Sequence, residues 1–161
     1  MSTLLLALAF LAAEPTPELP ELKALAGYVG RWDCRFEDNL HGASLKGTAE
    51  GEWILGGRFL HQTWTIDEPV LSGSSIMTYD PGKKSYRSWH FVSNGSTSEG
   101  AGKYDEKTKI MTWTVRDANG LRTTTHSSFD KDGNESWTIT VADGDGKVVS
   151  DMKGRNTKRR K

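Results

Sequence analysis

The residues best suited to chemistry in this sequence lie on strand-like segments rich in tryptophan. The alternation within these segments predicts one face that carries the candidate ligand-binding residues Gln62, Trp64, Arg87, Trp89, Trp113, Thr125 and Trp137. Apolar walls with a few polar groups that point to a common centre are typical of a small-molecule site. A guanidinium that is removed from water needs an anionic or hydrogen-bonding partner, so Arg87 would bind a carboxylate on the ligand.

Two alternatives to this interpretation stay open. Arg87 could reach the rim of the fold or pair with Glu99 on the neighbouring strand, in which case it needs no ligand. The tryptophans, which include Trp53 on the same phasing, could simply fill a core. The volume of any cavity would distinguish a filled core from a binding site.

Sequence motifs for catalysis are absent. The chain contains no G-x-S-x-G elbow, no H-E-x-x-H pair and no phosphate-binding loop that ends in Lys-Ser or Lys-Thr. We therefore expect no catalytic residue and no cofactor. An enzyme on the same scaffold would be a cofactor-free isomerase or hydrolase that uses Arg87, Gln62 or His90.

The four histidines do not form a metal-binding pattern. His61, His90 and His126 each fall on the face opposite the stronger apolar set of their segment, and His41 lies in a loop. We therefore expect histidines at the surface or the rim, and no metal or haem ligands. The segment Ser85–Val92 is ambiguous because both of its faces carry aromatic residues, and an inverted phase would turn His90 inward.

The elements that must position these residues are strands, and the clearest pair lies in Glu50–Ile66. Two strand-like runs are joined by Gly56-Gly57, which is a hairpin signal because such turns need positive φ. The turn sets a register in which Trp53 faces Leu60, Gly51 faces Gln62 and Ala49 faces Trp64. One face of the hairpin is then apolar and the other polar, with small residues beside Trp64.

Turn-forming residues recur at regular intervals along the rest of the chain. From Tyr28 onward, turn-rich stretches separate runs of about seven to ten residues that are enriched in β-branched and aromatic types. This spacing predicts an all-β fold, and the short connections favour a single antiparallel up-and-down barrel of about ten strands. Before the first strand, Glu21–Gly27 predicts a short helical turn that closes one end of the barrel.

Length and charge restrict the class of protein. The chain has 161 residues, which favours one domain, and its 21 Lys and Arg balance its 21 Asp and Glu. Nucleic-acid binding needs a basic surface, so this balance argues against it. The single cysteine, Cys34, excludes an intramolecular disulfide, and we expect it to be a buried thiol.

The N-terminus carries a short apolar run, Leu4–Ala13. This run is too short to span a bilayer, which takes roughly 20 residues, but it fits the core of a signal peptide. We expect a signal peptide or a disordered arm at residues 1–13, a linker at 14–20, the barrel at 21–157 and a basic tail at 158–161. A working signal peptide would make the protein extracytoplasmic, either periplasmic or secreted, and otherwise it would be cytoplasmic.

The start of the first expected strand, Gly30-Arg31-Trp32, resembles the Gly-x-Trp signature of lipocalins and other calycins. In those barrels the Trp packs under a basic residue from a late strand, a role that the resemblance would give to Lys153 or Arg155. The stretches Trp53–Leu60, Tyr79–Trp89 and Ser98–Gly100 resemble a bacterial family of lipocalin-like domains of unknown function. The resemblance implies a calycin-like barrel and no particular activity.

The sequence therefore favours a binding protein that holds a small, mainly apolar molecule inside a barrel. A ligand that also carries a carboxylate would suit Arg87. The expected partner is this small ligand, with no nucleic acid and no membrane span, while the oligomeric state stays open. The alternatives are the cofactor-free enzyme and a structural or partner-binding domain whose barrel is filled solid.

Overall fold

A computed structural model describes residues 19–117 and 120–159 of the chain. The expected signal peptide at residues 1–13, most of the expected linker and the last two residues of the basic tail lie outside the described residues. Within the described part, no helix is both long and apolar enough to cross a membrane.

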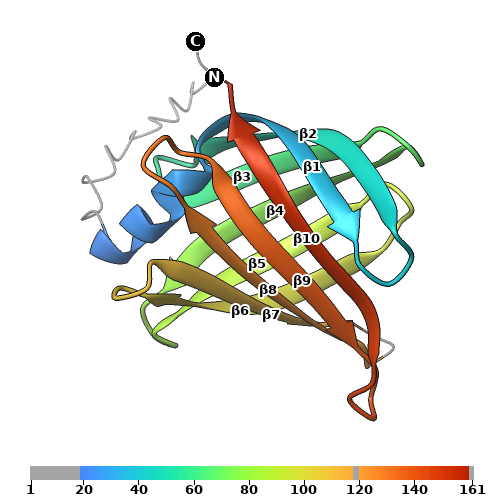
Figure 1. Cartoon of the computed structure of the whole chain (residues 1–161). Coiled ribbons are helices and arrows are strands. Elements are labelled where there is room, and N and C mark those ends of the chain that lie inside the picture. Colours follow the sequence, from blue (N-terminus) through green and yellow to red (C-terminus); the bar gives the residue numbers. More distant parts are fainter. Residues whose placement is uncertain (1–18, 118–119, 160–161) are drawn as a thin grey trace, which may run out of the picture.

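The described chain forms a closed antiparallel barrel of ten strands, which confirms the predicted fold class (Figure 1). Consecutive strands pair with each other and the last strand pairs with the first, so the sheet has no free edge. A short 3₁₀ helix, η1, precedes the barrel. The elements are η1 (Pro20–Tyr28), β1 (Gly30–Asp38), β2 (Ala43–Ile54), β3 (Phe59–Ile66), β4 (Leu71–Asp80), β5 (Ser85–Val92), β6 (Thr97–Asp105), β7 (Ile110–Arg116), β8 (Arg122–Phe129), β9 (Glu135–Ala142) and β10 (Val148–Lys158).

The β2–β3 hairpin has the predicted register. Trp53 pairs with Leu60, and the two pairs farther from the turn, Gly51 with Gln62 and Ala49 with Trp64, are also present. The connection is longer than two residues, because the strands end at Ile54 and resume at Phe59. Gly56 and Gly57 both adopt positive φ, 68° and 80°, which glycine does without steric cost.

The register also defines the inner face of the barrel, because directly paired residues point to the same side of a sheet. One inner row runs through Leu60, Met77, Ser88 and Gly100, each paired with the next. All of these residues are buried. Counted from this row, every second residue of a strand faces inward and the residues between them face outward.

The phase predicted for β5 is wrong. Tyr86 and Ser88 are buried and face inward together with His90, whereas Arg87 and Trp89 face outward. Hydrophobicity does not distinguish the two faces of β5, because both carry aromatic residues. The glycines of β6 pair with the buried side chains of β5 and leave them room inside the barrel.

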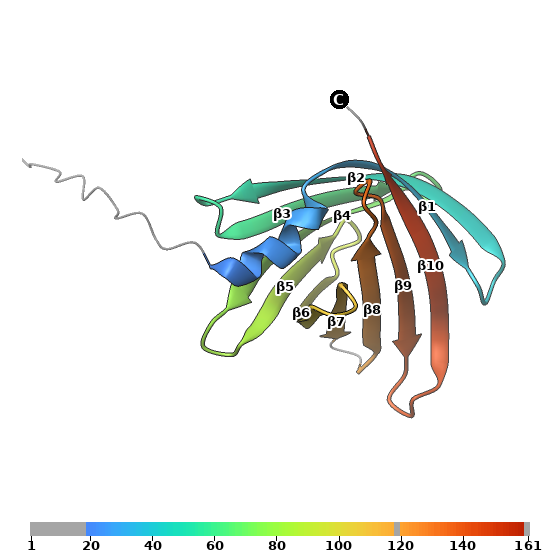
Figure 2. The ribbon, with the colours of Figure 1, turned by 60° about the vertical axis from the view of Figure 1, so that its left-hand side comes forward.

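Helix η1 lies across one end of the barrel, beside β3 and β4 (Figure 2). Its position confirms the helical turn predicted over Glu21–Gly27. The buried helix residues Leu22, Leu25 and Tyr28 form one core cluster with Leu60, Met77, Tyr86, Met111 and Trp113 of the barrel wall. The helix therefore fills this end of the barrel.

Trp32 of the Gly-x-Trp segment packs under a basic residue of the last strand. The residue is Lys158, whose Nζ lies 5.4 Å from the centroid of the indole ring. The expectation that Lys153 or Arg155 would do this is wrong, because both face outward, where each pairs with a carboxylate. Lys158 faces inward because it pairs directly with Trp32.

Candidate functional site

Inward tryptophans of the barrel lie over glycines of the neighbouring strand. The pairs are Trp64 with Gly73, Trp113 with Gly102 and Trp137 with Gly154. A Cβ at Gly102 would lie 2.7 Å from two ring carbons of Trp113, and at the other two glycines it would lie closer still to the indole. Each ring therefore occupies space at the wall that a side chain on the neighbouring strand would otherwise fill.

The main buried cluster of the interior lies at the end that η1 occupies. There Leu60 is 0% exposed, Met111 2% and Trp113 6%. Away from this cluster, some inward side chains such as Phe36 and Ser75 are buried and others keep partial exposure. We call the following partly exposed ones the lumen residues: Gln62, Trp64, His90, Thr123, Thr125, Trp137, Ile139 and Val141. Their partial exposure shows that solvent reaches these inward side chains.

The structure brings together part of the predicted ligand-binding set. Gln62, Trp64, Thr125 and Trp137 are lumen residues. Trp113 also faces inward, but it belongs to the filled end, where it packs edge-on against Tyr86. Arg87 and Trp89 do not belong to this set, because they lie on the outer face of β5.

Arg87 pairs with acidic side chains on the outside of the barrel. Its guanidinium forms an ion pair with Glu99 and lies 3.7 Å from an Asp80 carboxylate oxygen. Its Cζ also lies 5.6 Å from the ring centroid of Trp89. The prediction that Arg87 points inward is thus wrong and the alternative partner, Glu99, is right, so the reason to expect a ligand carboxylate at Arg87 disappears.

His90 takes the inward position on β5, contrary to the expectation of a surface histidine. Its Nδ1 is hydrogen-bonded to the Ser75 hydroxyl at 2.8 Å and its Nε2 to the Ser88 hydroxyl at 3.0 Å. Burial lowers the pKa of His90, which favours the neutral ring at pH 7. The other strand histidines, His61 and His126, face outward as predicted.

A second inward polar cluster escaped the sequence analysis. Glu135 is 6% exposed, and its carboxylate accepts a 2.7 Å hydrogen bond from the side-chain amide of Asn156. The Asn156 oxygen in turn accepts a 3.2 Å bond from the Trp137 indole, which fixes that ring. Burial raises the pKa of Glu135 to about 7. The signal was present in the alternation of β9, because Glu135 and Trp137 share a phase.

The same cluster reaches the helix. The Tyr28 hydroxyl, at the end of η1, is hydrogen-bonded to the hydroxyl of Ser127, and Ser127 is in turn hydrogen-bonded to Glu135. Tyr28 also packs edge-on against Phe129, with the ring centroids 4.9 Å apart. These contacts attach η1 to β8 and β9.

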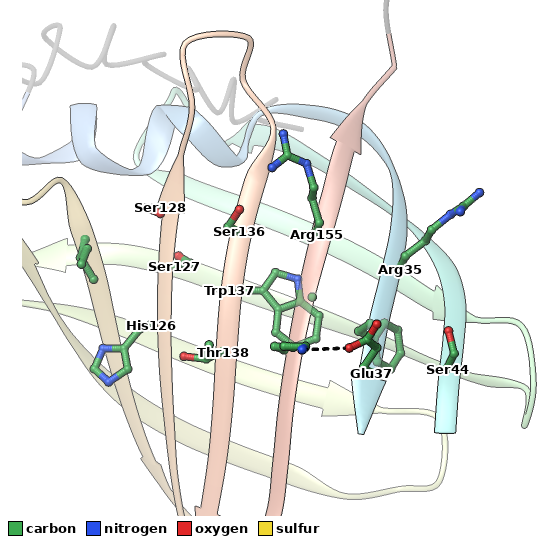
Figure 3. A pocket seen from close by; sticks show the side chains of 14 residues that line it. Arg35, Glu37, Ser44, His126, Ser127, Ser128, Ser136, Trp137, Thr138 and Arg155 are labelled. Carbon is green, nitrogen blue, oxygen red and sulfur yellow. Dashed lines mark ion pairs between the residues drawn. The ribbon is translucent and has the colours of Figure 1, made fainter. Parts of the chain in front are cut away.

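A pocket of about 690 Å³ lies at β1, β8, β9 and β10, and its lining includes both outward residues and the inward residues Phe36, Ser127 and Trp137 (Figure 3). Its walls include Arg35, Glu37, His126, Lys153 and Arg155, and the figure shows Arg35 and Arg155 extending away from their strands. The Lys153 ammonium lies 3.0 Å from the Glu37 carboxylate. Exposed pairs of this kind contribute little to binding or stability. The lining of this pocket therefore combines exposed charges with the apolar side chains of Phe36, Ile110 and Trp137.

Metal chemistry finds no support in the part of the chain that the structure describes. Across residues 19–117 and 120–159, no three His, Cys, Asp or Glu side chains come together in a way that could hold a metal ion. The turn that starts at Asp130 uses its carboxylate locally, to accept backbone N–H bonds from Asp132 and Asn134 at 2.9 and 3.0 Å.

Comparison with known proteins gives a family but no activity. The family model described as "Protein of unknown function (DUF1579)" matches residues 17–158. No curated protein matches the chain. Among solved structures, a de novo designed fluorescence-activating β-barrel is 17% identical over 84% of this chain and 98% of that chain, with a TM-score of 0.35. A score this low carries no inference about function.

Proposed function

This chain belongs to the DUF1579 family of proteins of unknown function, so a proposal for its function must be argued from its geometry. We propose that it binds a small, mainly apolar molecule inside the barrel. The observation that carries this proposal is the uneven filling of the interior. Side chains near η1 are buried, while the lumen residues keep partial exposure.

The Trp–Gly pairs explain how a barrel with so many inward tryptophans keeps room inside. A large ring that projected toward the axis would fill the interior, whereas a ring laid over a glycine thickens the wall. The indole faces then provide apolar contact area for a ligand at low cost in side-chain entropy.

The inward polar groups indicate an uncharged ligand. Gln62, Thr123 and Thr125 offer amide and hydroxyl groups that can orient a ligand by hydrogen bonds. On β2 to β9, every Arg and Lys of the described residues faces outward on the observed register, and the inward Lys158 of β10 lies over the Trp32 ring. With His90 neutral, the lumen residues contain no cation to pair with a carboxylate.

We favour binding without chemistry over an enzyme: the perturbed Glu135 carboxyl group also faces inward, but it is buried and hydrogen-bonded to Asn156. The enzyme alternative relied on Arg87, Gln62 or His90. Arg87 lies outside the barrel, and both ring nitrogens of His90 are already hydrogen-bonded to serine hydroxyls. A neutral imidazole between two hydroxyls donates one of these bonds and accepts the other, so His90 has no nitrogen left for a direct hydrogen bond to a ligand.

A matched pair of variants tests the proposal. Thr123→Trp places an indole among the lumen residues, and Thr124→Trp places the same indole on the outer face of the same strand. We expect the native protein and Thr124→Trp to bind the neutral fluorophore Nile red with similar affinity, and Thr123→Trp to bind it at least about tenfold more weakly because the site is filled.

Fluorescence titration measures these affinities, and circular dichroism confirms that both variants keep the β fold. Native mass spectrometry of protein purified from cells would identify a ligand already bound. Equal Nile red binding by all proteins, or none by the native one, would contradict a binding site in the interior.

A further inference from the structure

A second pocket lies at the opposite end of the interior from the lumen residues, between η1 and the β2–β3 hairpin. Its volume is about 400 Å³. Leu22, Lys23 and Ala26 line it from the helix, and Trp53 and Arg58 line it from the hairpin together with the glycine turn. This volume lies in the range of small-molecule sites, roughly 300–1,000 Å³.

Arg58 leaves hydrogen-bonding capacity unused at this pocket. Its Nη2 atom is shielded from solvent and has no hydrogen-bond partner among the described residues. The main chain of Arg58 is fixed, because its carbonyl oxygen accepts a 2.7 Å bond from the Thr78 hydroxyl. A guanidinium N–H that has lost water without gaining an acceptor is unfavourable, so a turn of the Arg58 side chain that brings this N–H to an acceptor in the adjoining pocket would be stabilising.

The charge of the pocket defines the kind of acceptor. Lys23 adds a second cation, and none of the lining residues is acidic. The remaining wall is apolar, with the Leu22 side chain, the Ala26 methyl group and the Trp53 indole. A ligand that suits both features has an anionic head and an apolar body.

We propose that the pocket between η1 and the β2–β3 hairpin binds a small organic acid with an apolar chain, whose carboxylate pairs with Arg58 and Lys23. A planar guanidinium matches the two oxygens of a carboxylate, and a charged hydrogen bond of this kind is stronger than a neutral one. The apolar chain would lie along Trp53 and Leu22. This site differs from the lumen in position and in the charge of its ligand.

Titration with decanoate tests this site, with 1-decanol as the uncharged ligand of the same chain length. We expect Arg58→Gln to weaken decanoate binding about tenfold or more and Lys23→Gln to weaken it less, because Lys23 is exposed. Arg122→Gln, which removes an exposed cation on the outer face of β8, should leave decanoate binding unchanged. Arg58→Lys should restore part of the affinity because it keeps the charge.

The lumen variant separates this proposal from the proposed function. Thr123→Trp should bind Nile red at least about tenfold more weakly and keep Arg58-dependent decanoate binding. If Arg58→Gln binds decanoate as tightly as the native protein, the proposed anion site is wrong, whatever Nile red does. Loss of decanoate binding in Thr123→Trp alone would place the acid in the lumen, which also overturns this site but leaves the proposed function intact.

Discussion

At the scale of single residues, Glu135 shows how burial in the barrel interior changes the pKa of a carboxyl group. Its carboxyl group is 6% exposed and keeps one side-chain amide, that of Asn156, as a donor at 2.7 Å. Burial raises its pKa from 4.5 to about 7. The folded chain thus binds this proton more tightly than the unfolded chain, so the free energy of unfolding falls as the pH rises from about 4.5 to about 7.

We therefore expect Glu135→Gln to be more stable than the native protein at pH 8 and nearly equal to it at pH 4. The pKa change from 4.5 to about 7 corresponds to about 3 kcal/mol once the carboxyl group is ionised, a cost that the neutral amide avoids. Urea unfolding at the two pH values measures the difference. The lowered pKa of His90 makes stability rise with pH instead, but this contribution is common to both proteins and cancels.

An exposed acid provides the control for this measurement. Glu68 lies in the exposed β3–β4 connection, and Glu68→Gln makes the same chemical change outside the buried cluster, so it should not stabilise the protein at pH 8. A native protein as stable as Glu135→Gln at pH 8 would contradict the assignment of a buried, perturbed carboxyl group.

At the scale of strand pairs, the Trp–Gly contacts make a position without a side chain important for stability. We expect Gly73→Ala to lower the free energy of unfolding by about 1–3 kcal/mol, because its methyl group would overlap the Trp64 indole. Gly144→Ala is the matched control, since a Cβ there meets no atom within 4 Å. Thermal and urea unfolding of both variants measure the effect.

A double variant shows whether the overlap with Trp64 is the cause. When Trp64→Leu removes the ring, adding Gly73→Ala should cost much less than it costs in the native chain. A cost for Gly73→Ala that is the same with and without the indole would point to backbone effects in β4 and would contradict the proposed packing.

The strand pairs also show which features of the fold, such as strand register and strand phase, could be predicted from the sequence. The β2–β3 register was predictable because the glycine turn and the alternating faces agree with each other. The phase of β5 was not, because Trp89 on one face and Tyr86 on the other are equally apolar. Only the pairing with β6, a contact between strands, decides which of them faces inward.

The candidate site was predictable to the same extent as the strands that carry it. Trp64 and Trp137 lie on strands with a clear alternation and were placed correctly, whereas Arg87 and Trp89 lie on the ambiguous one. Lys158 was missed as the partner of Trp32 because β10 extends to Lys158 itself, which the sequence assigned to a basic tail.

At the scale of the whole molecule, the division of the interior into a filled and an accessible half depends on where η1 folds back. Strand periodicity tells which side chains face inward, but it does not tell how far a helix outside the sheet enters the barrel. Leu25 is fully buried although η1 has only weak amphipathic character. Filling is therefore a property of the assembled barrel and could not be read from the strands one at a time.

Closure of the barrel also protects its single thiol. Cys34 lies on β1, faces inward and pairs with Asn156 of β10 and Gly47 of β2, so it belongs to the seam that closes the sheet. Burial raises the pKa of this thiol from 9.0 to about 12. The thiolate is the reactive species, and this change lowers its fraction at pH 8 about a thousandfold.

We expect the folded protein to react with the thiol reagent DTNB at pH 8 about a thousandfold more slowly than a free thiol, because the raised pKa of Cys34 lowers the fraction of thiolate by this factor. Absorbance at fixed DTNB concentration gives the rate. Adding urea should raise the rate in proportion to the fraction of unfolded chain, since a sheet without edges opens as one unit. Reaction in buffer at the rate of a free thiol would show that the seam between β1 and β10 opens by itself.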